Sequence, residues 1–490
     1  MDKLFSRKTS SALLALSLLL LGAASSFAEV FRPIQVLLPG NINGNLITFT
    51  SDNEHKGSDA FRLPKVVEKF CNEHDKDSII FGLGNDSNAF KAFSFFNKGK
   101  AERELIAKCN PAACGVSPND LEVFNSGLLS TDIKQRVFTN VEAPDYAPIF
   151  ERYSVTKLNG SNFYFFNFIS PEYGAKLPLS KWSELRIDDP CRALRKANIK
   201  PDKKDYTISV VYGDKFTIDE LSEEFNNIDG THFIVNVPIN DELPLFSYVR
   251  AESENLKVSR FSVQPGHLSL PILNIIPKNV GYPRTTLRMI PLARYQDYDI
   301  ENDVEEIWQQ IRQEFHKPLK VIPATNRATT SANQISLQAH AEMLRYATTA
   351  ELAFLKLPEQ ISFTDSVITV GNSITRFPND RIIKFKATEP QLKGMFLDLL
   401  QSSNIKQLGF SGCQFSVLGI NYWDFTINKH SINKQHRYSV ATTETTANEF
   451  VVKNLLKSCD IEPYDGLTLW EVWMENFKSF KAPEDKLFSN

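Results

Sequence analysis

The segment LLPGNINGNLITF, residues 37–49, joins an apolar run at Ile34–Leu38 to a tight polar turn. A strand that ends in such a turn is typical of α/β proteins, where ligands bind beyond the carboxyl ends of the strands. Enzymes that hold two divalent metal ions often place Asp and His ligands in this turn. Here the polar residues are Asn41, Asn43 and Asn45, whose amide oxygens are neutral, weak ligands. Because Asn tolerates the left-handed conformations of tight turns, we predict a turn kept for the fold without its metal chemistry.

Short apolar runs alternate with helical patterns through the first half of the chain. The predicted strands are Ile34–Leu38, Ser78–Leu83, Phe163–Ile169, Thr207–Tyr212 and His232–Val237, and the predicted helices lie around Leu63–Cys71, Ala101–Cys109, Pro190–Ala197 and Ile218–Asn226. Strands separated by helix-length segments predict α/β layering with a largely parallel sheet.

The pattern changes near residue 300, and this change predicts a second domain. Apolar residues from Ile300 to Phe315 recur on one face of a helix, which Pro318 ends. The polar segment PATNRATTSANQ, residues 323–334, is typical of a linker or an exposed loop. In the helix predicted to follow it, His340 shares the apolar face of Leu337 and Leu344, as a core histidine does.

The N-terminus indicates export. Three basic residues within the first eight precede an apolar run at Ala12–Leu21, and Ser26-Phe27-Ala28 forms a signal-peptidase site. We therefore expect a mature chain that begins near Glu29 and is periplasmic or secreted, without membrane insertion after cleavage; the alternative is a retained N-terminal anchor. The formal net charge of −3 gives no broad positive field for nucleic acid.

The chain has six cysteines, an even number that suggests disulfides in an oxidising compartment. Six cysteines allow 15 pairings. We expect Cys413 and Cys459 to pair, because both fall in the second domain; buried free thiols are the alternative.

Several segments of the second half, taken in order, resemble the bacterial periplasmic 5'-nucleotidase/UDP-sugar hydrolase family. They are QISLQAHAEMLRYATTAELAFL at 334–355, SFTDSVITVGNSITRFPNDRIIKFKATEPQLKGMF at 362–396, LGFSGCQFSV at 408–417 and DGLTLWEVWMENF at 465–477. The resemblance implies an α/β architecture, α+β overall: a metallophosphoesterase-like layered domain and then a smaller 5'-nucleotidase C-terminal-type domain. It implies a signal peptide at 1–28, the first domain at 29–298, a linker helix and loop at 299–330 and the second domain at 331–490.

The first domain departs from the family at every metal motif. The family's Asp-x-His-Gly motif falls on residues 41–44, and its Gly-Asp turn falls on Gly84-Asn85. The other ligand positions hold Val116, Ser117, Tyr212, Pro238 and Asn240. The nucleoside pocket departs as well, because KLPEQIS at 356–362 replaces the family's Asn-Gly-Gly-Ile-Arg segment. Phe377 and Phe450 are the candidate base-stacking residues, with core packing as the alternative for both.

The leading hypothesis is an exported, catalytically inactive relative that binds an unknown small molecule or an envelope or secreted protein, with no cofactor. The alternative is a phosphoester hydrolase with a remodelled all-oxygen site for Mg²⁺, Mn²⁺ or Ca²⁺. Its candidate ligands lie close to the lost positions and are Asp86, Asp120, Asp214 and Asp241. A structural role in the cell envelope is a third possibility.

Overall fold

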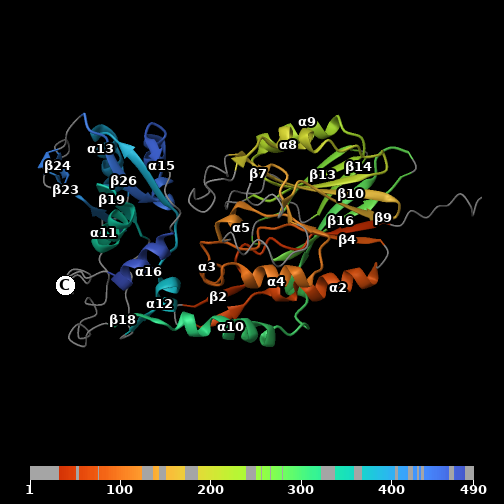
Figure 1. Cartoon of the computed structure of the whole chain (residues 1–490), viewed down its shortest axis with the longest axis horizontal. Helices are drawn as coiled ribbons and strands as arrows, with labels where there is room; N and C mark the ends of the chain where they lie inside the picture. Colours follow the sequence, from red (N-terminus) through yellow and green to blue (C-terminus); the bar gives the residue numbers. More distant parts are fainter. Residues whose placement is uncertain are drawn as a thin grey trace, which may run out of the picture.

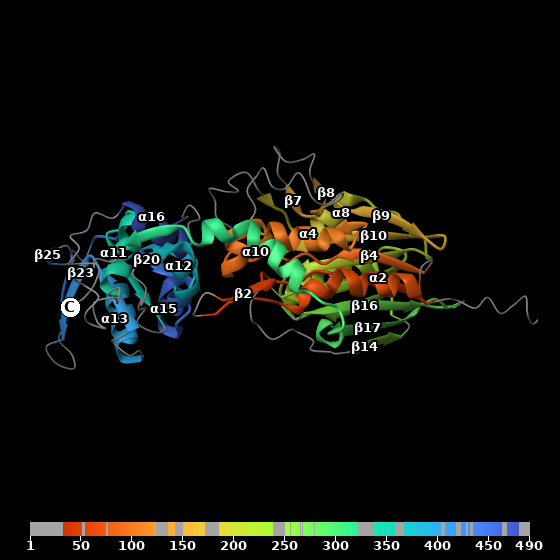
Figure 2. The ribbon, with the colours of Figure 1, turned by 90° about the horizontal axis from the view of Figure 1, so that it is seen from below.

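The computed structural model describes residues 33–50, 54–74, 77–123, 136–142, 150–171, 186–238, 250–254, 256–264, 266, 268–278, 280–321, 337–357, 367–402, 407–417, 423–427, 430–431, 435–462 and 468–479. It has an N-terminal part, residues 33–300, and a C-terminal part, residues 318–479. The two lie side by side and are joined by helix α10, Glu301–Phe315 (Figures 1 and 2). Each sheet is formed within one part.

An eight-stranded mixed sheet organises the N-terminal part. Its order is β14 (Arg250–Glu254), β17 (Arg284–Pro291), β16 (Ser269–Ile276), β1 (Ile34–Leu37), β4 (Ser78–Gly82), β5 (Ala113–Cys114), β6 (Arg136–Val137) and β8 (Phe150–Glu151). Strands β1, β4, β5, β6 and β8 run parallel to one another, whereas β16 pairs antiparallel with β1. The carboxyl ends of β1, β4 and β5 therefore meet at one edge.

A second sheet of five strands packs against the first. Its order is β15 (Val258–Ser262), β13 (Thr231–Asn236), β12 (Tyr206–Tyr212), β10 (Ser161–Ile169) and β9 (Ser154–Leu158), and only β9 is antiparallel to its neighbour. Apolar side chains of both sheets, such as Val36 and Phe81 against Phe165 and Val235, share one core. The predicted α/β layering is confirmed, but as two sheets in place of one.

Helices cover the outer faces of this pair of sheets (Figure 1). The helices α2 (Leu63–Glu73) and α4 (Lys100–Lys108) pack on the first sheet, and α8 (Pro190–Ala197) and α9 (Lys215–Asn226) pack on the second. Two short helices, α3 (Ala92–Asn97) and α5 (Pro118–Val123), follow β4 and β5.

The C-terminal part contains a five-stranded sheet with helices around it. The sheet order is β22 (Leu408–Ser411), β19 (Leu352–Lys356), β26 (Tyr438–Thr443), β21 (Ile382–Ala387) and β27 (Asp460–Glu462); the helices include α11 (Leu337–Thr348), α12 (Val370–Arg376), α13 (Glu389–Ser402), α15 (Phe450–Leu456) and α16 (Leu469–Ser479). Strand β18 (Pro318–Val321), directly after α10, pairs with β20 (Val367–Thr369). The linker segment at 323–334 lies outside the described residues.

All six cysteines are free thiols in the structure. The expected Cys413–Cys459 disulfide is therefore not formed, although Cys413 and Cys459 border the same apolar cluster of the C-terminal part. The expected signal peptide lies outside the described residues. Within the described ranges, no helix combines the length and apolar character needed to cross a membrane.

Candidate functional site

Five asparagines converge where β1, β4 and β5 end, and we call them the amide cluster: Asn41, Asn43, Asn85, Asn88 and Asn119. The first two follow β1, the next two follow β4, and the last lies on α5, directly after β5. All but Asn43 are buried. The parallel strands therefore bring together three segments that are far apart in the sequence.

The amides of the cluster satisfy one another. Asn85 Nδ2 donates to Asn41 Oδ1 at 2.8 Å, and Asn119 Nδ2 donates to Asn85 Oδ1 at 3.0 Å. Asn43 Oδ1 accepts from Asn88 Nδ2 at 2.7 Å and from Asn119 Nδ2 at 3.3 Å. Because each amide has a donor and an acceptor end, buried amides can form such a chain without any charge.

The backbone fixes the two turns against each other. Asn41, Asn43 and Asn85 have φ values of 60°, 52° and 55°, in the left-handed region that Asn adopts more readily than most residues. The backbone N–H of Asn43 donates to the carbonyl oxygen of Asn85 at 2.7 Å, and that of Gly44 donates to the carbonyl of Asp86 at 2.8 Å. The predicted conformational reason for Asn in the first turn is confirmed, and it extends to the second turn.

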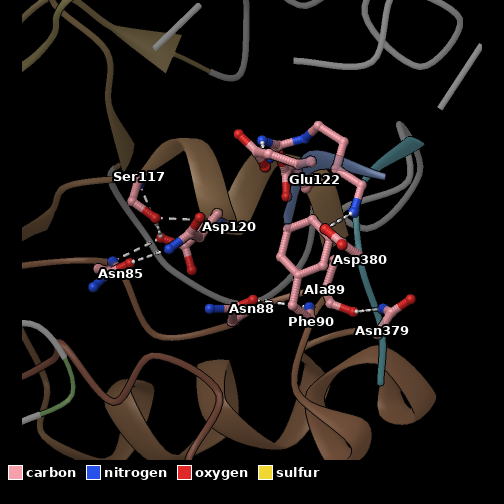
Figure 3. A network of polar contacts seen from close by, with 12 residues as sticks. Asn85, Asn88, Ala89, Phe90, Ser117, Asp120, Glu122, Asn379 and Asp380 are labelled. Carbon is pink, nitrogen blue, oxygen red and sulfur yellow. Dashed lines mark hydrogen bonds and ion pairs between the residues drawn. The ribbon is translucent and has the colours of Figure 1, made fainter. Parts of the chain in front are cut away.

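Asp120 holds the second turn to helix α5. Its Oδ1 accepts from the backbone N–H groups of Asp86 and Ser87 and from the Ser87 hydroxyl, at 2.8 to 3.0 Å. Its Oδ2 accepts from the N–H groups of Asn85 and Ser117 and from the Ser117 hydroxyl, also at 2.8 to 3.0 Å (Figure 3). Six donors therefore saturate this buried carboxylate.

Asp86 is buried beside the amide cluster. Burial raises the pKa of its carboxyl well above the ordinary value, and the carboxylates of Asp120 and Glu102 raise it further. Asp86 Oδ1 has no hydrogen-bond partner among the described residues. Without a cation beside it, a carboxyl in this environment favours its neutral form.

Tyr212, at the end of β12, fills the space from the side of the second sheet. Its buried hydroxyl donates to the carbonyl oxygen of Leu83, and burial raises the pKa of this hydroxyl. The contact needs Gly84, where φ is +74° and an added Cβ would lie 2.7 Å from the Tyr212 hydroxyl oxygen. Tyr212 is therefore a packing and hydrogen-bonding residue at this position.

Comparison with known proteins rests on structure, because no protein-family model and no curated protein matches the sequence. A Staphylococcus aureus protein assigned as a 5'-nucleotidase and crystallised with alpha-ketoglutarate has a TM-score of 0.63 at 9% identity, over 94% of this chain and 99% of that chain. Haemophilus influenzae NAD nucleotidase has a TM-score of 0.61 at 13% identity, over 91% of this chain and 96% of that chain. A 5'-nucleotidase precursor from Thermus thermophilus has a TM-score of 0.53 at 14% sequence identity, over 92% of this chain and 97% of that chain. The chain has a 5'-nucleotidase-like fold.

The 5'-nucleotidase-like fold implies two divalent ions at these strand ends, and the residues that the structure describes there do not fit them. The oxygens of Asn41, Asn43 and Asn85 already accept hydrogen bonds within the cluster. Among the described residues, no group of three or more His, Cys, Asp or Glu side chains is arranged to hold a metal ion. Val116 lies in the core between the sheets, and Pro238 is buried beyond β13.

The structure describes three of the four candidate aspartates, and these three do not converge as ligands. Asp86 and Asp120 lie at the amide cluster, where Asp86 is buried and Asp120 already accepts from six donors. Asp214 caps helix α9, where its Oδ1 accepts from the backbone N–H of Thr217 at 2.9 Å. Asn240 and Asp241 lie outside the described residues.

Of the two candidate base-stacking residues, the structure describes the side chain of Phe377 but not that of Phe450. Phe377 is buried, 2% exposed, and its ring lies 4.3 Å from that of Trp473 and 5.3 Å from that of His340, centroid to centroid. It therefore packs in the core of the C-terminal part, where its ring cannot stack on a ligand without rearrangement. Phe450 begins helix α15, and its side chain lies outside the described set.

Sequence reasoning missed Asn88 and Asn119 as members of the cluster. Neither falls on a motif position, because Asn88 lies three residues beyond the Gly-Asn turn and Asn119 lies two residues beyond Ser117. The signal in the sequence was that Asn recurs after the predicted strands β1 and β4 and after the short strand β5. This recurrence identifies one site only once the parallel order of the three strands is known.

Proposed function

We propose that the chain is an exported, catalytically inactive protein with a 5'-nucleotidase-like fold that acts by binding a ligand or a protein partner. The amide cluster carries this proposal. Its neutral side chains are paired with one another in the place where the fold's chemistry needs charged and imidazole ligands. Metal-dependent phosphoester hydrolysis requires a metal-activated water and metal charge on the phosphate. The loss of even one ligand or supporting group typically costs 10- to 100-fold in affinity or activity.

The alternative, a hydrolase with an all-oxygen metal site, has less support. It needs carboxylates that are free to coordinate, and Asp120 is saturated by backbone and hydroxyl donors. Asp214 is used as a helix cap. Asp86 then remains as one buried carboxylate, which does not by itself offset the charge of a divalent ion. Export is supported by the apolar run and the Ser26-Phe27-Ala28 site of the sequence.

Metal analysis combined with an activity screen tests the proposal. The purified full chain is incubated with Mg²⁺, Mn²⁺, Ca²⁺, Zn²⁺ or Co²⁺, desalted, analysed for bound metal and assayed with 5'-nucleotides and UDP-sugars. We expect no stoichiometric metal and no turnover above the buffer control. Turnover that disappears in Asp86→Ala but persists in Asp214→Ala would overturn the proposal and locate the alternative site at the amide cluster.

A further inference from the structure

Arg381, which lies directly before β21 in the C-terminal part, contacts two segments that carry residues of the amide cluster. We propose that Arg381 is a latch that holds the C-terminal part against the segment 85–91 and helix α5, and that this latch and the amide cluster stabilise each other. The latch is a property of the folded chain and does not depend on whether the protein has activity.

Arg381 contacts three side chains from both parts. Its guanidinium is paired with Glu122 on α5 and with Glu444 of the C-terminal part, the latter at 2.8 Å from Nη1 to Oε2. Its Cζ lies 5.2 Å from the ring centroid of Phe90, a cation–π arrangement. Glu122 is buried and Arg381 is 22% exposed, so the ion pair between the parts is largely shielded from water.

The backbone around Arg381 is held firmly within the C-terminal part. Its carbonyl oxygen accepts from the N–H of Glu444 at 2.7 Å, and its own N–H donates to the side chain of Asp380 at 2.8 Å. Arg381 also forms an isolated β-bridge with Thr468. The guanidinium is therefore presented to Glu122 from a hydrogen-bonded backbone.

On the other side, the partners of Arg381 belong to the elements that build the amide cluster. Helix α5 contributes Asn119 to the cluster and Glu122 to the latch, and its Asp120 holds the turn that carries Asn85. Asn88 donates to Asn43 with its Nδ2 and accepts from the backbone N–H of Phe90 with its Oδ1, at 2.7 and 2.8 Å. Helix α5 and the segment Asn88–Phe90 thus each connect the cluster to the latch. Figure 3 shows Asn88 beside Phe90 and Asp120 beside Glu122.

Two further contacts join the parts beside the latch. Asn379 Nδ2 donates to the carbonyl oxygen of Ala89 at 2.6 Å, and Asn379 Oδ1 accepts from the backbone N–H of Trp470 at 3.0 Å. The ring of Phe95 on α3 meets the ring of Trp470 edge-on, with 5.3 Å between centroids. The segment from Asn88 to Phe95 is therefore fixed by the C-terminal part at several points.

The physical basis of the coupling is the burial of Glu122. Removal of one partner from a buried ion pair leaves the other charge without compensation, and this penalty is larger than the net value of the pair. Without Arg381, the Glu122 carboxylate either takes up a proton or reaches water, and the proposed coupling requires that it reach water through a shift of α5. A shift of α5 moves Asp120, whose carboxylate holds the N–H groups of Asn85, Asp86 and Ser87.

Hydrogen–deuterium exchange of the full chain tests the latch. In Arg381→Gln, we expect the amides of residues 85–88 to exchange about tenfold faster, with β12 unchanged. Asn119→Ala removes two amide contacts of the cluster and should accelerate exchange around Asn379 and Trp470. In the double variant, the two effects should be less than additive, because either change alone already releases the shared elements.

The control is Arg195→Gln, which removes an exposed ion pair with Glu224 on the far helices α8 and α9 and should leave residues 85–88 unchanged. If β12 also loses protection in Arg381→Gln, the variant is globally unfolded. The exchange of residues 85–88 is then measured in Arg381→Lys, where we expect the same acceleration. Lys keeps the charge but cannot pair with two carboxylates in the fixed geometry of a guanidinium. Unchanged exchange at residues 85–88 in the folded variant would overturn the proposal.

Discussion

Asn85 shows at the scale of one residue why an amide suits a strand end that has no metal ion. A set of carboxylates without a cation would be buried with like charges close together, which is costly. The Asn85 amide is neutral, donates to Asn41 and accepts from Asn119. It also adopts the left-handed backbone conformation that the turn needs. One residue type thus meets the polar and the conformational demands together.

Glu102 is buried in α4 near Asp86, and its pKa gives a prediction of pH dependence. Burial raises the pKa of Glu102 from 4.5 to about 7. The folded state therefore keeps a neutral carboxyl that the unfolded chain ionises from about pH 4.5, so this stability is present below pH 4.5 and is lost as the pH rises through 7. Glu102→Gln cannot ionise. We expect its free energy of unfolding, relative to the natural chain, to rise by about 3 kcal/mol between pH 4 and pH 8.

Urea denaturation at pH values from 4 to 8 measures this difference. The matched control is Glu104→Gln on the same helix, because Glu104 is exposed and faces Lys100. Parallel stability curves for Glu102→Gln and the natural chain would contradict the prediction.

Part of the site was predictable from single residues. Asn41, Asn43 and Asn85 follow strands that the apolar runs identify, and their conformational role follows from the turn. The hydrogen bonds from Asn88 and Asn119 were not predictable, since they depend on contacts between turns 34 or more residues apart in sequence. The expected Cys413–Cys459 pair was wrong for a related reason, because two thiols near one apolar cluster need not face each other.

At the scale of elements, strand positions were predicted more accurately than their assignment to sheets. Strands β12 and β13 are buried at every residue. Buried strands appear in the sequence as largely apolar runs, and such a run does not indicate which sheet the strand joins. The antiparallel strands β14, β16 and β17 of the first sheet were not predicted, and neither was β15 of the second sheet. The pairing of β16 with β1 depends on contacts across more than 200 residues, and the local sequence does not encode it.

Helix α5 gives a prediction that separates a structural aspartate from a helix cap. Asp120→Ala removes the acceptor of six donors, several of them buried, and we expect it to lower the free energy of unfolding by about 3 kcal/mol or more. Asp214→Ala removes one capping bond at the start of α9 and should cost about 1 kcal/mol. Urea unfolding followed by circular dichroism compares the two variants. Equal costs would show that the Asp120 contacts are not maintained in solution.

At the scale of the whole molecule, α10 and β18 tie the two parts together in addition to the latch. The ring of Phe315 at the end of α10 packs on Gly371 of α12, where an added Cβ would lie 2.1 Å from it. Strand β18 then pairs with β20 of the C-terminal part. The division into two domains, with a linker helix and loop at 299–330, remains a prediction, and the polar segment at 323–334 follows β18 in the sequence.

This order of elements predicts the behaviour of a chain cut within that segment. Trypsin should cleave at Arg327, since polar linkers are preferred proteolytic sites. We expect the two fragments to co-elute on size exclusion, because β18 stays with the first fragment and its partner β20 with the second. The contacts of Arg381 with Glu122 and of Phe95 with Trp470 add to this association. Separate elution of the fragments under native conditions, or a first cut within residues 34–240, would show that the parts are divided or held together differently.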